Sequence, residues 1–228
     1  DRPTAHQARW LCHARRTAFP FPVVAATTSA GGITPEASLD APQVLLVAVA
    51  GRIWAQDALA CLDAVKTPYA LLGDPGDFVV ANGLARVVRF LHLHPDYICA
   101  GGLSVCYQGL GPPPAATSEL PFAAAGTWRQ PAALWEAPTP AGTGLPEVWW
   151  AAFRPMDLDQ VTAERRIAAF GSNFRPLYGF VFRTPVLRQI LNELTAAQTC
   201  SELRFEVALA WQAALRGRMH LLAKAVCL

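Results

Sequence analysis

The segment from Thr67 to Gly101 constrains the fold more than any other part of the chain. It begins with an apolar run, Tyr69–Leu72, which lies between a proline and a glycine and has the length of a buried strand. The next four residues, Asp74-Pro75-Gly76-Asp77, predict a β-turn, because proline sets φ for the second position and glycine suits the third. Such a turn brings its first and last residues within about 7 Å of each other. The sequence therefore predicts two carboxylates close together at the end of a strand.

A helix is predicted directly after this turn. We expect Asn82 to cap it, and His94-Pro95 to end it, because the residue before a proline is disfavoured in a helix. One face of the helix is apolar, with Leu84, Val87, Val88 and Leu91 at helical spacing. In open α/β sheets, ligands bind beyond the carboxyl ends of the strands. The two aspartates are therefore expected where such a sheet holds its ligand.

The rest of the chain alternates strand and helix patterns, as an α/β fold does. Apolar runs at 20–26 and 43–50 predict two strands, and residues 54–65 predict a helix that leads into the strand at Tyr69. Strand, helix and strand in this order predict a right-handed crossover between parallel strands. The remaining patterns predict helices over 2–16, 160–170, 185–194 and 201–216, strands over 103–108 and 219–222, and an extended segment over 177–182.

Composition indicates one globular domain of 228 residues, with 53% hydrophobic and 16% charged residues. A net charge of +2 is too small to indicate a nucleic-acid partner, which calls for a clustered basic face. The longest apolar run, Val44–Ala50, has the length of a strand and is far short of the roughly 20 residues of a transmembrane helix. The sequence therefore predicts a chain without a transmembrane segment.

Two further features bear on the setting of this domain. The six cysteines include no Cys-x-x-Cys pair, so we expect buried free thiols in a reducing compartment and a cytoplasmic protein. Residues 111–146 are rich in proline, glycine and alanine and lack periodicity, which predicts a long excursion over the surface. Nothing in the sequence indicates the oligomeric state.

The central segment resembles the donor-site segment of family-two-like glycosyltransferases with the GT-A fold. The matching residues are Thr67, Pro68, Tyr69, Asp74, Asp77, Phe78, Gly83, Leu84, Phe90, Leu91, Pro95, Asp96, Tyr97 and Gly101. Pro75 and Gly76 differ, because these relatives carry acidic residues at both positions. A second set of matches lies further along the chain, at Glu164, Arg165, Tyr178, Arg183, Thr184 and Leu187.

The resemblance implies a fold for the whole chain. Residues 1–228 are expected to form a single Rossmann-like domain of the nucleotide-diphospho-sugar transferase type, a three-layer α/β/α sandwich with a mainly parallel sheet. In these relatives a tripeptide like Asp1-Arg2-Pro3 follows the first strand, so that strand is missing here. Either the sequence is a fragment of a longer protein, which we favour, or the protein has replaced the strand.

The resemblance also implies a set of site residues. Asp74 and Asp77 would hold a divalent cation, Mn²⁺ or Mg²⁺. The replacement of the two central acidic residues by Pro75 and Gly76 argues against this cation site. The edge formed by Ala26, Thr27, Thr28 and Ser29 would face the nucleotide, although relatives usually carry an aspartate at about Ala26 or Thr27 that is missing here. Tyr178 and Arg183 are candidates for acceptor contacts, and the alternative is that they only pack and pair.

The catalytic base is expected near the start of the helix at 201–216. Relatives place it eleven residues before a glycine, and counting back from Gly217 gives Glu206. Glu202 lies one turn earlier on the same side and is the alternative base. A third interpretation is that both carboxylates are solvated residues that favour a helix N-terminus.

Two functions follow from these expectations. The first is an inverting glycosyltransferase, which moves a sugar from a nucleoside diphosphate sugar to a hydroxyl of a glycan, lipid or small-molecule acceptor. The second is a catalytically degenerate GT-A-fold protein that acts as a binding or scaffold module. The altered acidic motif and the missing nucleotide-binding aspartate favour the second, while Glu206 and the Asp74–Asp77 turn favour the first.

Overall fold

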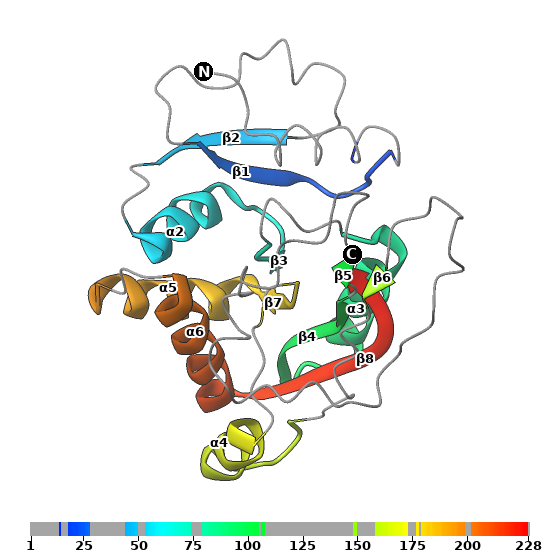
Figure 1. The fold of residues 1–228 in the computed structure, drawn as a ribbon, viewed down its shortest axis with the longest axis vertical. Coiled ribbons are helices and arrows are strands. Elements are labelled where there is room, and N and C mark those ends of the chain that lie inside the picture. The colour runs from blue at the N-terminus through cyan, green and yellow to red at the C-terminus, as the bar shows by residue number, and fades with distance from the viewer. Residues whose placement is uncertain are drawn as a thin grey trace.

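The structure of the chain is a computed structural model. The structure describes residues 14, 18–27, 44–49, 53–73, 79–104, 106–107, 148–149, 158–172, 177, 179–198 and 202–227. Strands and helices are interspersed along the described part of the chain (Figure 1). The strands are β1 (Val23–Thr27), β2 (Val44–Ala48), β3 (Tyr69–Leu71), β4 (Tyr97–Ser104), β5 (Cys106–Tyr107), β6 (Val148–Trp149), β7 (Val181–Arg183) and β8 (Arg218–Cys227). The helices are α2 (Trp54–Ala64), α3 (Ala81–Leu93), α4 (Ala163–Ser172), α5 (Thr184–Ala196) and α6 (Glu202–Arg216).

The main sheet of the described residues has four strands in the order β3-β7-β4-β8. Strand β7 runs antiparallel to both of its neighbours, while β4 and β8 are parallel. A second, parallel pair is formed by β1 and β2, and β5 pairs antiparallel with β6. The sheet is therefore mixed, and the expectation of a mainly parallel sheet is not confirmed. The expected crossover also differs, because β2 and β3 lie in different sheets of the described part.

The side chains of the main sheet divide between two hydrophobic clusters, one on each face. Alternate residues of a strand point to opposite faces, and accordingly Cys99 and Phe182 belong to one cluster while Ala100 and Val181 belong to the other. The first cluster includes buried residues of α2, α5 and α6, and the second those of α3. Figure 1 shows α3 on one side of β4, with α5 and α6 on the other. The expected helix–sheet–helix layering is thus present.

Several boundaries differ from the sequence prediction. Asn82 is not the cap of α3, because Val80 occupies the N-cap position and Asn82 lies inside the first turn. Helix α4 begins at Ala163 rather than residue 160. The predicted extended segment over 177–182 is interrupted at Gly179, whose φ of 78° lies in the left-handed region that glycine tolerates. Only Val181–Arg183 is strand. The predicted apolar face of α3 is confirmed, with Leu84, Val87 and Leu91 buried.

Several predictions concern residues outside the described part. These are the helix over 2–16 apart from Ala14, the missing first strand, and the excursion over 111–146.

Buried arginine contacts hold the C-terminal helices together. Arg166 of α4 is only 6% exposed, and its Nε and Nη2 donate to the carbonyl oxygens of Ala214 and Leu215 at 2.8 and 3.0 Å. The last carbonyls of a helix have no partner within that helix, so a cation placed there satisfies them and complements the helix dipole. Arg166 therefore fixes the C-terminal end of α6, just before Gly217 and β8.

Candidate functional site

The carboxyl end of β3 is the edge at which the sequence predicts the donor site. Strand β3 is described up to Leu71 and the chain up to Gly73, one residue before Asp74. The N–H of Gly179 donates to the carbonyl oxygen of Leu72 at 3.1 Å. This bond places Leu72, two residues before Asp74, and Gly179, the residue after Tyr178, at the same edge of the sheet. The side chains of Asp74, Asp77 and Tyr178 themselves lie outside the described residues.

The predicted nucleotide edge follows β1. Ala26 is half-buried in this strand and pairs in parallel with Val47 of β2, and Thr27 is the last residue of the strand. Parallel strands end at the same edge, so the carboxyl ends of β1 and β2 lie together. Thr28, Ser29 and the side chain of Thr27 are outside the described part, so the nucleotide role of this edge stays a prediction.

Glu206, the predicted base, lies on the core-facing side of α6. It is 7% exposed, and the residues three and four positions on, Leu209 and Ala210, are 1% and 0% exposed. Residues at these spacings share one helix face. The interpretation that Glu206 is a solvated carboxylate is therefore wrong. Glu202 is the first residue of α6, and its side chain is outside the described part.

Arg183, predicted as an acceptor contact or a packing residue, makes several contacts with protein groups. Its Nε donates to the carbonyl oxygen of Tyr97 at 2.8 Å, and its Nη2 donates to those of Leu91 at 2.6 Å and His94 at 3.0 Å. The guanidinium also lies 5.7 Å from the ring centroid of Tyr69. These contacts are those of the packing alternative, with Arg183 closing the C-terminal end of α3. An acceptor contact by Arg183 stays untested.

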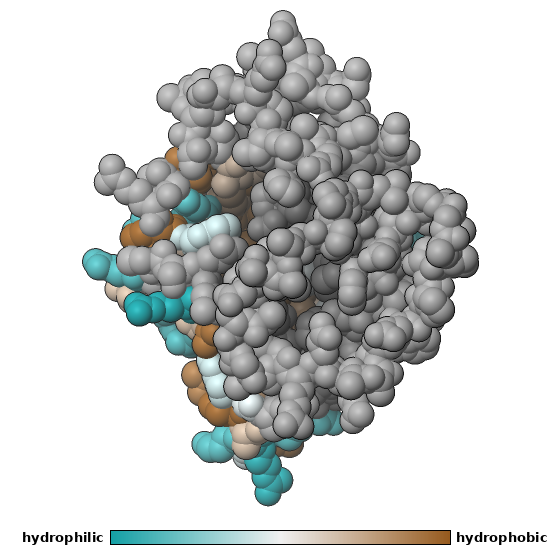
Figure 2. All heavy atoms as spheres, viewed as in Figure 1, coloured by the Kyte–Doolittle hydropathy of each residue, from teal (hydrophilic) through white to brown (hydrophobic). Residues whose placement is uncertain are grey.

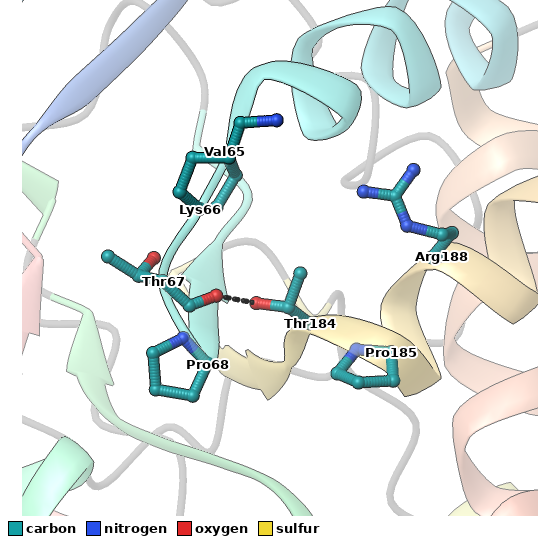
Figure 3. Close-up of a pocket in the computed structure, with 7 residues that line it drawn as sticks. All are labelled: Val65, Lys66, Thr67, Pro68, Thr184, Pro185 and Arg188. Atoms are coloured by element: carbon teal, nitrogen blue, oxygen red, sulfur yellow. Dashed lines mark hydrogen bonds between the residues drawn. The ribbon is translucent and has the colours of Figure 1, made fainter.

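A shallow groove of about 550 Å³ lies at the opposite edge of the sheet. It is lined by Val65, Lys66, Thr67, Pro68, Thr184, Pro185 and Arg188, from the entry to β3 and the start of α5 (Figure 3). Thr184 Oγ1 donates to the carbonyl oxygen of Thr67 at 2.8 Å, and Arg188 pairs with Asp63. Since β3 and β7 are antiparallel, this groove lies at the start of β3 and not at the end that leads to Asp74. The sequence analysis predicted no groove here, although Thr67, Pro68 and Thr184 belong to the matching segments.

The described part of the molecular surface shows mixed polarity around these elements. In the view of Figure 2, hydrophobic and hydrophilic residues alternate along the flank that carries α2, α5 and α4. In the part of the chain that the structure describes, no group of three or more His, Cys, Asp and Glu side chains is arranged to hold a metal ion. Within the same part, none of the helices is long and apolar enough to cross a membrane.

The two cysteines that the structure describes in full are free thiols. Cys99 is completely buried in β4, and this burial raises the pKa of its thiol far above the ordinary value. Burial also raises the pKa of Cys61 in α2, and the nearby carboxylate of Asp57 adds to this shift. Both thiols are thus held in the protonated form, which is neither nucleophilic nor a metal ligand.

Comparison with known proteins identifies the fold. No family model and no curated protein matches the sequence. A crystal structure of residues 1–349 of TarS from S. aureus, a GT-A-type glycosyltransferase, matches 99% of this chain with a TM-score of 0.54 and 14% sequence identity. A second crystal structure of S. aureus TarS matches 98% of the chain with a TM-score of 0.55 and 13% identity. The chain spans 58% and 34% of the lengths of those two chains. At this identity the likeness concerns the fold alone.

Proposed function

We propose that the protein is an inverting glycosyltransferase that uses a nucleoside diphosphate sugar. The fold supports this class, because the likeness to TarS extends over 99% of the chain. The observation that carries the proposal is the burial of Glu206, which is 7% exposed on the core-facing side of α6. Glutamate is among the residue types that are least often buried, since removing a carboxylate from water costs free energy.

The position of α6 supports a catalytic role for Glu206. Helix α6 contacts β4 and β8, and only Gly217 separates its last residue from the first residue of β8. A helix that precedes a strand of the sheet can return over the sheet, and we propose that the first turns of α6 lie toward the carboxyl ends of β4 and β8. With a rise of 1.5 Å per residue, Glu206 lies about 16 Å along the helix from Gly217, roughly the length of five strand residues. We propose that Glu206 faces the same edge of the sheet as Asp74.

In the proposed reaction, Glu206 accepts the proton of the acceptor hydroxyl. The acceptor oxygen forms a bond to the anomeric carbon from the face opposite the diphosphate. The bond from that carbon to the diphosphate oxygen breaks, and its electron pair leaves with the nucleoside diphosphate. One displacement of this kind inverts the anomeric configuration.

We propose that Asp74 and Asp77 hold a divalent cation at this edge. Carboxylate oxygens are the donors that Mg²⁺ and Mn²⁺ accept, and phosphate oxygens and water would complete the shell. When bound, the cation neutralises charge on the departing diphosphate. Ala26, Thr27, Thr28 and Ser29 would border the nucleotide, and Tyr178 would face the acceptor. Arg183 has a separate, structural role in this proposal, because its guanidinium donates to the end of α3.

A catalytically degenerate binding module is the second candidate. The Pro75-Gly76 pair in the acidic motif and the absence of an aspartate at Ala26 or Thr27 favour it. It shares the fold and the nucleotide edge but predicts no turnover.

A transfer assay separates the two candidates. The parent, Glu206→Gln and Glu202→Gln are assayed over a panel of nucleotide sugars, and a thermal melt checks that each variant is folded. Removal of a general base lowers the rate on the order of 10²–10⁴-fold, whereas donor binding stays nearly unchanged. Glu202→Gln is the matched control, one turn away on the same helix, and we expect a smaller effect. Absence of turnover by the full-length parent with every donor contradicts the enzyme and favours the binding module.

A further inference from the structure

The outward face of α3 carries an unusual combination of charge and apolar surface. Arg86, Arg89 and Leu93 are all exposed, and Leu93 is 61% exposed. At 100° per residue these three side chains fall within one narrow stripe, with spacings of three and four residues. His92 is exposed beside this stripe. We call Arg86, Arg89, His92 and Leu93 the α3 stripe.

The α3 stripe has no internal charge compensation. Helix α3 contains no acidic residue. The nearest carboxylate beyond its end, Asp96, forms an ion pair at 2.5 Å with Arg218 of β8. Among the described residues, no ion pair involves Arg86 or Arg89. Arginines that form no ion pair with the described residues attract an anionic partner.

The opposite face of α3 packs in the hydrophobic core. Leu84, Val87 and Leu91 are buried in the cluster between α3 and the sheet. The helix is anchored at its C-terminal end by Arg183, through the carbonyl oxygens of Leu91 and His94. The stripe is thus presented by a rigid helix, and binding there requires no unfolding of the domain.

We propose that the α3 stripe docks on the surface of an anionic lipid bilayer. The positive charge of Arg86 and Arg89 favours an anionic partner. The exposed side chain of Leu93 favours a bilayer, which has an apolar interior, over a soluble polyanion, which has none. An exposed leucine one turn beyond Arg89 has no use on a polyanion, whereas at a membrane it enters the region between headgroups and acyl chains while the arginines contact lipid phosphates. This contact is peripheral and independent of the proposed sugar transfer.

Vesicle co-sedimentation of the full chain tests the proposal. Phosphatidylcholine vesicles are compared with vesicles containing 30% phosphatidylglycerol, at low and high salt. We expect binding only to the anionic vesicles, and loss of binding at high salt. Arg86→Gln with Arg89→Gln should weaken the partition on the order of 25-fold, since each arginine near an anionic surface contributes about fivefold. Leu93→Ser should weaken it several-fold without changing the salt dependence. All four side chains are exposed, so the melting temperature should stay within about 2 °C of the parent's.

The control variant is Lys66→Gln with Arg165→Gln, which removes the same number of positive charges from exposed positions outside α3. This control should bind like the parent. Equal weakening of the control contradicts the proposal, because the attraction would then depend on net charge alone. No binding to anionic vesicles also contradicts it. If inorganic polyphosphate binds with the same arginine dependence and Leu93→Ser changes neither ligand's affinity, the stripe is a polyanion surface and the membrane proposal is wrong.

Discussion

Nη2 of Arg183 donates to the carbonyl oxygen of Leu91 at 2.6 Å, across 92 positions of the sequence. This bond joins the last turn of α3 to β7, the antiparallel strand between β3 and β4. It pairs a cation with a helix C-terminus, where the dipole is negative. Arg183 therefore stabilises the C-terminal end of α3. This end of the helix is remote from the predicted metal turn, which lies between β3 and the start of α3.

Replacement of Arg183 should destabilise the domain. Arg183→Met removes three charge-assisted donors and leaves three carbonyl groups without them, so we expect a loss of about 3 kcal/mol in the free energy of unfolding. Arg183→Lys should recover only part of it, because an ammonium group lacks the planar fork that reaches separate carbonyls. Urea denaturation measures both. Arg188→Met is the control, since Arg188 donates to the single carbonyl of Leu62 and pairs with an exposed aspartate, and its cost should be about 1 kcal/mol. If Arg183→Met and Arg188→Met lower the free energy of unfolding equally, Arg183 does not anchor α3.

Gly101 allows β4 to approach the ring of Phe180. A Cβ atom at Gly101 would lie 2.6 Å from ring atoms of Phe180, a distance that requires a shift of the ring or the strand. We expect Gly101→Ala to cost about 2 kcal/mol through overpacking, measured as a shift of the urea midpoint at constant slope. Gly73→Ala is the control, since its Cβ would lie 3.3 Å from the flexible end of Leu71 at an exposed site. A urea midpoint for Gly101→Ala equal to the parent's would contradict this, because it would mean that Gly101 and the ring of Phe180 are packed less tightly than the structure indicates.

The ion pair of Glu193 with Arg216 should make stability depend on pH. The hydrogen bond from Arg216 lowers the pKa of Glu193 in the folded protein. A lowered folded pKa stabilises the fold above the unfolded value, about 4.3, and this contribution is lost as the pH falls through the folded pKa. The melting temperature of Glu193→Gln should therefore lie below that of the parent at pH 7 and approach it at pH 3. An unchanged difference between the two proteins at both pH values contradicts a role for this pair in pH dependence.

Metal and nucleotide should bind together at the proposed donor site. Two carboxylates alone provide few ligands for a hard cation, so Mn²⁺ by itself should bind weakly, and a nucleoside diphosphate should tighten it by adding phosphate oxygens. Titration calorimetry of the parent, with uridine and guanosine diphosphates, measures both steps. Asp77→Asn should abolish the coupling, whereas Asp63→Asn, at an exposed aspartate on α2, should leave it intact. If neither nucleotide binds with or without metal, the donor site as proposed is wrong.

The sequence by itself determined most of the helices and several of the strands, because these depend on local patterns. The apolar run at Tyr69–Leu71, the apolar face of α3, and the end of α6 before Gly217 all follow from periodicity and helix-breaking residues within a few positions. The α/β class follows from the order of these elements, whereas the layering of helices on both faces of the sheet was an expectation from the family resemblance.

The tertiary structure alone decided how these elements pair and which polar groups they bury. The direction of β7 depends on hydrogen bonds to β3 and β4, which are distant in sequence. A strand of three residues has no local sequence pattern that indicates whether it pairs parallel or antiparallel. The burial of Glu206 depends on the elements that pack over α6 and not on its own helix pattern, which also suits a solvated carboxylate. The sequence left open whether Arg183 contacts an acceptor or only packs, and its hydrogen bonds to backbone carbonyls 86 to 92 positions away follow only from the tertiary structure. Contacts across such separations are physical consequences of chain packing, and no local pattern encodes them.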